Sequence, residues 1–238
     1  MNRKGLSGRA LKDRVFGLLK STDVDRALEE LSGLSGRQVV NPLFSFLYSR
    51  DPNVKWAAVT AMGAIVTKLA DEDMEAARVV MRRLMWNLND ESGGIGWGSP
   101  EAMGEILACH EGLAQEYAHI LISYARENGN YLEHDMLQRG LLWGIGRLSQ
   151  VRPRLVQGAV PYLIPYLESN DATMRGLAAW VMGLMGVKEV RSRLKILERD
   201  ENHVQIYLDH KLIGRRVMDL AREALRRLSD TEEPRAQI

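Results

Sequence analysis

Two distant segments of the chain carry the same pattern of residues. The segment 43–66 reads LFSFLYSRDPNVKWAAVTAMGAIV, and the segment 163–186 reads LIPYLESNDATMRGLAAWVMGLMG. In both, an apolar helix-like stretch ends in a polar turn, and an aspartate is followed four positions later by a basic residue. A second apolar stretch, rich in small residues, then ends in Met-Gly. Because self-similarity at a fixed period is typical of repeat architectures, this pattern constrains the fold more than any single motif does.

Two weaker copies lie between these segments, and a fifth unit ends in RRVMDLAREALRRL. The equivalent glycines of the first four units lie about 41, 42 and 37 residues apart, and they are Gly63, Gly104, Gly146 and Gly183. Helix-pair repeats have periods of roughly 40–47 residues. The sequence therefore predicts an all-α fold, an α-α superhelix of about five helix pairs with extra N-terminal helices.

The domain prediction is a single repeat domain over residues 1–238. Residues 1–36 are expected to form N-terminal capping helices, residues 37–228 about five repeats, and residues 229–238 a polar tail. Leu11, Val15, Leu18 and Leu19 recur at helical spacing, and a second short helix is expected to follow Thr22 or Asp23.

The second helices of the two clearest units have recognisable start signals. Asp51 is a good N-cap and Pro52 suits the first helical position. Asp171 is expected to cap its own helix in the same way. Lys55 and Arg175 then lie one turn inside these helices.

This pattern resembles the HEAT-repeat family, including the bacterial HEAT-like repeats of phycobilisome-lyase-type proteins. The resemblance rests on the pattern L-x3-L-x3-D-x2-V-[KR]-x2-A-x2-A-[LM]-G and covers roughly residues 37 to 228. It implies a HEAT/armadillo-like solenoid, and it implies that Lys55 and Arg175 bridge to the capping acid of an adjacent repeat. A repeat architecture of this kind does not specify a reaction.

Composition narrows the classes of partner. Lys and Arg total 32 and Asp and Glu total 31, so the net charge of +1 makes nucleic acid an unlikely partner. No apolar stretch approaches the roughly 20 residues of a membrane helix, so no membrane contact is expected. The one cysteine, Cys109, favours a reducing, cytoplasmic location.

The segment NDESGGIGWGSPEAMGEIL, residues 89–107, departs from the repeat pattern. Ser92 aligns with Asp51 and should start a helix, yet it is followed by Gly93, Gly94, Gly96 and Gly98. Each interior glycine costs a helix about 0.5–1 kcal/mol relative to alanine. A new start signal follows, with Ser99 as the expected N-cap and Pro100 at the first helical position. We therefore expect a loop in place of the helix start, forming a notch beside Trp97.

In the family that the sequence resembles, the second helices line the concave surface. The repeat alignment puts Glu101, Trp143 and Trp180 at equivalent positions of successive helices, with Thr60 before them. The predicted partner-binding surface consists of Trp97, Glu101, Glu105, Arg139, Trp143, Arg175 and Trp180. The alternative is that Trp143 and Trp180 pack between helices and that Trp97 is a plug on neighbouring helices.

Other candidate chemistry is sparse. His110–Glu111 is similar to the diiron-binding pairs of HEAT-like deoxyhypusine hydroxylases, which need such pairs on several repeats, and this chain has one. His203 and His210 are seven residues apart and would share a face of a helix, but no third metal ligand is evident. GGIGWG lacks the preceding strand and the following Lys-Ser/Thr of a phosphate loop. We therefore expect no catalytic residues, no metal and no cofactor.

The function that these observations favour is a non-catalytic protein–protein interaction or scaffold module. It would bind a protein or peptide partner through the concave surface and the glycine-rich notch. The alternative is a HEAT-like enzyme, either alkyl-base DNA glycosylase-like or tetrapyrrole-lyase-like. Assembly into a homo-oligomer or a larger complex is a third interpretation.

Overall fold

The computed structural model describes residues 7–89 and 96–230. The chain divides into two compact units, with the division between Leu113 and Ala114, and each unit is described by itself. The interpretation as a single domain stays a prediction. In the glycine-rich segment, Ser92, Gly93 and Gly94 lie outside the described residues.

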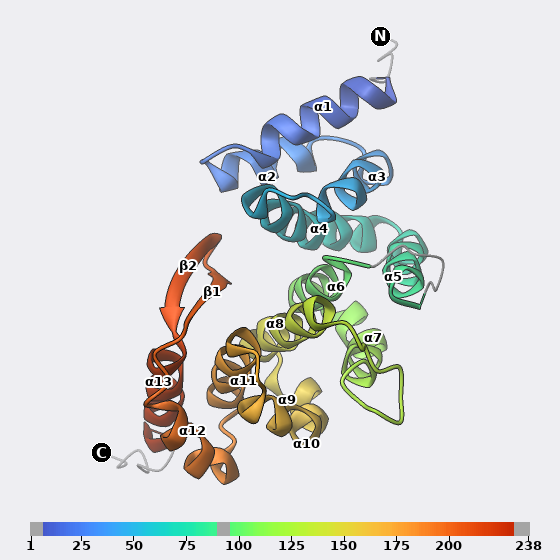
Figure 1. Ribbon diagram of the computed structural model, residues 1–238. Coiled ribbons are helices and arrows are strands. Elements are labelled where there is room, and N and C mark those ends of the chain that lie inside the picture. The colour runs from blue at the N-terminus through green and yellow to red at the C-terminus, as the bar shows by residue number, and fades with distance from the viewer. Residues whose placement is uncertain (1–6, 90–95, 231–238) are drawn as a thin grey trace, which may run out of the picture. The chain divides into compact units, whose positions relative to one another are not determined.

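Unit 1 is built from helices that pack in sequence order. They are α1 (Gly8–Leu19), α2 (Val24–Ser32), α3 (Gly36–Leu47), α4 (Pro52–Glu72), α5 (Met74–Asn89) and α6 (Ser99–Cys109). The long helix α4 packs against α3 on one side and against α6 on another, and α2 and α5 also contact it (Figure 1). Apolar side chains at helical spacing, such as Leu43, Leu47 and Met62, form the core between these helices.

The predicted helix starts of unit 1 are confirmed except for one. Asp23 caps α2 by accepting from the Arg26 N–H, and Asp51 caps α4 by accepting from the Asn53 N–H. The prediction that Ser99 caps α6 is wrong, because Ser99 is the first residue of that helix and Gly98 precedes it with φ of +78°. A left-handed backbone at this position favours glycine over serine.

Unit 2 contains both helices and a hairpin. Its elements are α7 (Glu111–Ser123, across the division), α8 (Asp135–Val151), α9 (Pro153–Val156), η1 (Gln157–Ala159), α10 (Val160–Leu163), η2 (Ile164–Glu168), α11 (Ala172–Met185), η3 (Lys188–Val190), α12 (Arg191–Leu197), β1 (His203–Leu208), β2 (Lys211–Arg216) and α13 (Val217–Asp230). Helix α11 packs between α8 and α13 (Figure 1). Within unit 2, α11 therefore holds two helices of neighbouring repeats together.

The segment before α11 is broken into short helical pieces, α9, η1, α10 and η2. Pro153, Pro161 and Pro165 stand at the starts of three of these pieces. Proline lacks the N–H that a helix interior uses and its ring clashes with the preceding turn, so one continuous helix cannot form here. The interruption leaves side chains of η2 beside the start of α11, where the pocket described below lies.

The prediction that His203 and His210 share a helix face is wrong. His203 begins β1 and His210 lies in the two-residue turn to β2, and the strands pair antiparallel from His203–Arg216 to Leu208–Lys211. Asp209 and His210 have φ of 47° and 62°. Two successive left-handed residues are typical of a tight hairpin turn. The hairpin precedes α13, which extends to Asp230, so the predicted tail from residue 229 starts inside a helix.

Trp143 of α8 anchors this hairpin. Its indole Nε1 donates a hydrogen bond to the Tyr207 carbonyl oxygen at 2.8 Å, and the two rings lie 6.1 Å apart between centroids.

Among the described residues, no helix is both long enough and apolar enough to cross a membrane.

Candidate functional site

Basic side chains of one helix bind acidic groups later in the chain. Neither Lys55 nor Arg175 binds a helix-capping acid as the family resemblance implies, but Arg139 does. In unit 2, Arg139 of α8 binds the Asp171 carboxylate, which also caps α11 by accepting from the Met174 N–H. Arg175 Nε donates to Asp200 Oδ2 at 2.7 Å. In unit 1, Lys55 Nζ lies 2.5 Å from Glu101 Oε1, so here the acid is in the first turn of α6 and is not its cap. These pairs join consecutive repeats within each unit.

The environment of two of these acids favours their charged forms. Burial alone would raise the pKa of Asp171, but hydrogen bonds from Arg139 and from backbone N–H groups of α11 outweigh it and hold that pKa below its ordinary value. The pKa of Asp200 is also lowered, because hydrogen bonds from Asn202 and Arg175 outweigh the effect of burial. Both carboxylates are therefore stabilising in their ionised state.

We expect acid to weaken unit 2 through these groups. A lowered folded-state pKa gives stability that is present above the ordinary value of 3.8 and is lost as the pH falls through the folded-state pKa. In Arg139→Gln, the pKa of Asp171 should rise, because burial then has less opposition. Carboxyl NMR titration measures it, and Arg193→Gln, which breaks the exposed pair with Glu168, serves as the control and should leave Asp171 unchanged.

The predicted partner-binding residues of unit 1 have unequal exposure. Trp97 is 42% exposed, whereas Glu101 is 3% and Glu105 is 6% exposed. Glu101 Oε2 has no hydrogen-bond partner among the described residues. Position 98 needs glycine for two reasons. Its φ is left-handed, and an added Cβ would lie only 2.9 Å from the Leu47 carbonyl oxygen. Trp97 is thus presented by backbone that packs on the end of α3.

The predicted residues of unit 2 are mostly covered. Trp143 and Trp180 are 3% and 5% exposed, so for both indoles the structure shows the packing that the alternative interpretation describes. The Arg175 side chain is 16% exposed, and that of Arg139 is 37% exposed. All four side chains lie on α8 and α11, which pack against each other. The two tryptophans belong to the core and the two arginines form ion pairs, so they do not make an open aromatic stripe.

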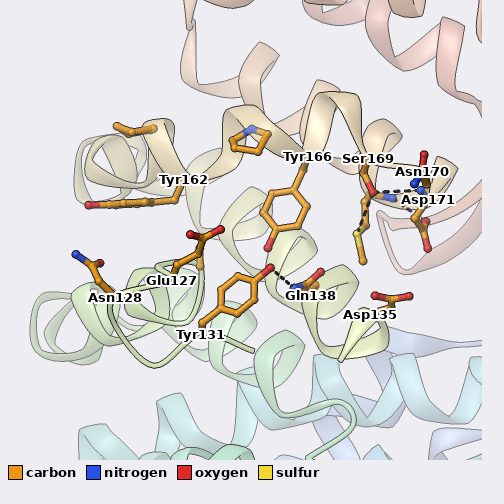
Figure 2. Close-up of a pocket in the computed structure, with 14 residues that line it drawn as sticks. Glu127, Asn128, Tyr131, Asp135, Gln138, Tyr162, Tyr166, Ser169, Asn170 and Asp171 are labelled. Atoms are coloured by element: carbon orange, nitrogen blue, oxygen red, sulfur yellow. Dashed lines mark hydrogen bonds between the residues drawn. The ribbon is translucent and has the colours of Figure 1, made fainter. Parts of the chain in front are cut away.

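An open pocket lies elsewhere in unit 2. Its volume is about 870 Å³, and it lies between the loop after α7, the start of α8 and the segment from α10 to the start of α11 (Figure 2). The residues that line it are Ala125, Glu127, Asn128, Tyr131, Asp135, Gln138, Pro161, Tyr162, Pro165, Tyr166, Ser169, Asn170, Asp171 and Met174. None of these residues belongs to the partner-binding surface predicted from the sequence, in which Asp171 is a helix cap and Asp135 part of a polar helix start.

Tyrosine and glutamine side chains meet in the middle of this pocket. Gln138 Nε2 donates hydrogen bonds to Tyr131 Oη at 2.6 Å and to the Leu132 carbonyl oxygen at 2.8 Å. Figure 2 shows the hydroxyl of Tyr166, from η2, directed toward that of Tyr131. Burial raises the pKa of Tyr166 well above its ordinary value, and the Tyr131 hydroxyl and the Glu127 charge raise it further. Tyr166 is therefore a neutral phenol at physiological pH.

Comparison with known proteins agrees with the repeat assignment. Residues 135–185, which include α8 and α11, match the family model of the HEAT-like repeat. An uncharacterized protein of the archaeon Archaeoglobus fulgidus is 25% identical over 187 residues, covering 75% of this chain and 91% of that protein.

Solved structures with a similar fold include designed armadillo repeat proteins. One designed armadillo repeat protein has a TM-score of 0.51 and 18% identity, over 92% of this chain and 99% of that one. Another, solved in complex with the peptide (KR)4, has a TM-score of 0.52 and 18% identity over the same shares. The protein thus has the predicted helical-repeat fold and resembles armadillo/HEAT repeat proteins, but it is mostly helical rather than all-α because of the β1–β2 hairpin. The phycobilisome-lyase subtype stays a prediction.

Proposed function

We propose that the protein is a non-catalytic helical-repeat module that binds a segment of a protein or peptide partner. The observation that carries this proposal is the open pocket of unit 2, which offers tyrosine rings, carboxylates and amides on one concave patch. Clefts that combine aromatic surface with a few convergent polar groups are the usual form of a binding site. That a designed armadillo repeat protein was solved with a bound peptide supports the same class of partner.

Two of the residues predicted from sequence stay in this proposal as separate contact points. The indole of Trp97 in unit 1 and the guanidinium of Arg139 in unit 2 are accessible enough to meet a partner. Glu101, Glu105, Trp143, Arg175 and Trp180 would act by holding the helices in place. The single cysteine still favours a cytoplasmic location for the module.

Selection from a random dodecapeptide library displayed on phage tests this function. We expect peptides to be enriched on the purified wild-type protein and to bind saturably when their fluorescence anisotropy is measured. Failure of the library to yield any saturable binder would contradict the proposed function.

Two matched tryptophan variants locate the binding. Asn128→Trp adds an indole at the exposed rim of the pocket, and Ser192→Trp adds the same indole to an exposed position of α12. We expect the first variant to weaken binding of the selected peptides and the second to leave it unchanged. Equal affinities for the two variants would remove the pocket from the proposal.

A further inference from the structure

Two carboxylates at the pocket of unit 2 form no ion pair among the described residues, and the guanidinium of Arg126, a cation beside the pocket, lies over the Tyr162 ring. Glu127 and Asp135 are exposed and form no ion pair within residues 7–89 and 96–230, whereas Asp171 is bound to Arg139. No lysine or arginine is among the residues that line the pocket. Asp135 also lies in the first turn of α8, where the helix dipole favours it, so its charge alone does not define a site.

Several side chains in the pocket offer hydrogen-bond acceptors, although its asparagine amides and tyrosine hydroxyls can also donate. The Leu132 carbonyl oxygen can only accept a hydrogen bond, so the Gln138 amide must direct its Nε2 group toward it. Nε2 donates both observed bonds, which leaves Oε1 of Gln138 as an acceptor for a ligand. The Tyr166 hydroxyl is buried, with the residue 8% exposed, and it makes no hydrogen bond within normal distance and angle limits among the described residues, although it points toward the Tyr131 hydroxyl, which adds to the effect of burial in raising its pKa. A ligand rich in N–H donors would satisfy these atoms.

The aromatic rings add a preference for cations. Tyr131, Tyr162 and Tyr166 present rings to the pocket, and the negative face of an aromatic ring attracts ammonium and guanidinium groups. The guanidinium of Arg126, whose Cζ lies 5.4 Å from the Tyr162 ring centroid, already makes such a contact within the protein. Pro161, Pro165 and Met174 supply apolar surface along which the methylene stem of a long basic side chain packs.

We propose that this pocket binds the arginine side chain of a peptide partner. The inference rests on the proposed function and names the residue type that the site selects. Arginine fits better than lysine because its planar guanidinium presents five N–H donors at fixed angles, stacks on tyrosine and reaches several acceptors at once. Glu127 and Asp135 supply the countercharge, and Tyr166 Oη and Gln138 Oε1 accept hydrogen bonds.

Three fluorescein-labelled octapeptides test this selectivity. They alternate serine with arginine, with lysine or with citrulline, which has nearly the shape of arginine but no charge. We expect the arginine peptide to bind at least about tenfold more tightly than the citrulline peptide, because truncating one partner of a charge pair has effects of this size or larger, with the lysine peptide between them. Equal affinities for arginine and citrulline peptides, or tighter binding of lysine, would overturn the proposal.

Charge-matched variants separate the pocket from general electrostatic attraction. Glu127→Gln/Asp135→Asn should weaken binding of the arginine peptide about two- to tenfold, since it removes both unpaired carboxylates and exposed charge pairs each contribute a small factor. Glu189→Gln/Asp209→Asn removes the same charge from exposed positions of unit 2 and should leave the affinity unchanged. If the two double variants lose affinity equally, the pocket is not the arginine site.

A third variant and a small-molecule competitor complete the test. Tyr166→Phe should weaken binding of the arginine peptide a few-fold without lowering the melting temperature, because it deletes a buried hydroxyl with no regular partner. Unchanged affinity would remove Tyr166 from the site.

The small cation agmatine, used as a competitor, should displace the peptide only at far higher concentration. If agmatine binds as tightly as the peptide, the ligand of the pocket is a free organic cation and not a peptide side chain. If the library selection yields saturable binders that lack arginine, the proposed function stands and the inference that the pocket selects arginine is wrong.

Discussion

Replacing Trp143 with alanine is expected to lower the free energy of unfolding of unit 2 by about 3–5 kcal/mol, the usual cost of truncating a buried tryptophan. The indole is 3% exposed on α8, and its Nε1 donates to the Tyr207 carbonyl oxygen of β1. The substitution therefore opens a cavity and also leaves a backbone acceptor of the hairpin without its donor. Urea denaturation followed by far-ultraviolet circular dichroism measures the change.

The matched control for this prediction is Trp86→Ala on α5. That indole is 72% exposed, so its removal should change stability by less than about 0.5 kcal/mol. A Trp143→Ala protein as stable as Trp86→Ala would mean that Trp143 is not a packing residue, and it would return that indole to the list of candidate partner contacts.

Gly183→Ala is expected to destabilise unit 2 by about 3 kcal/mol, at the upper end of the cost of overpacking a core. A Cβ at this position of α11 would lie 2.6 Å from Ala224 Cα and 2.7 Å from Ala224 Cβ. The conflict is with the backbone of α13, so no change of rotamer relieves it, and the two helices must move apart. Thermal unfolding monitored by circular dichroism measures the loss.

Gly17→Ala is the matched control, and we expect it to raise the stability rather than lower it. Gly17 lies in α1, and an added Cβ there meets nothing within 4 Å. Alanine should stabilise that helix by about 0.5–1 kcal/mol, because glycine is the poorer helix former. Similar changes for both variants would contradict the close packing of α11 on α13.

The repeat pattern predicted the parts of the fold that depend on local signals. The helix starts at Asp51 and Asp171 are confirmed because a capping carboxylate acts on N–H groups two or three residues away. The spacing of the Met-Gly signatures likewise reflects close approach of helices, as at Gly183. Each of these features depends on a few consecutive residues, so it can be predicted without considering the rest of the chain.

The hairpin was missed although its sequence contains a strand signal. Val204 and Ile206 alternate with polar residues, but the turn uses Asp209 and His210 rather than the Asn-Gly or Asp-Gly pair that marks most tight hairpins. The repeat period, which places a helix pair here, outweighed the alternation in our interpretation. Tertiary packing on α11 and α13 supports the strands locally.

The pocket was missed for a different reason. Tyr131 and Tyr166 are far apart in sequence, and Tyr131 lies in a weak copy of the repeat whereas Tyr166 lies in a clear one, so no spacing rule joins them. Asn-Gly at 128–129 and the prolines at 161 and 165 signal a loop and a broken helix, which could have drawn attention to these segments. The predicted tryptophan stripe, in contrast, followed the repeat correctly and led to side chains that the repeats bury.

If the pocket of unit 2 binds a peptide segment, an NMR titration will show which residues the peptide contacts. The isotope-labelled protein is titrated with the best peptide from the library selection. We expect the largest chemical-shift changes at saturation to fall on Tyr131, Gln138 and Tyr166 and to be absent in Asn128→Trp. Shifts that cluster elsewhere while these three residues stay unchanged would contradict the proposed binding site.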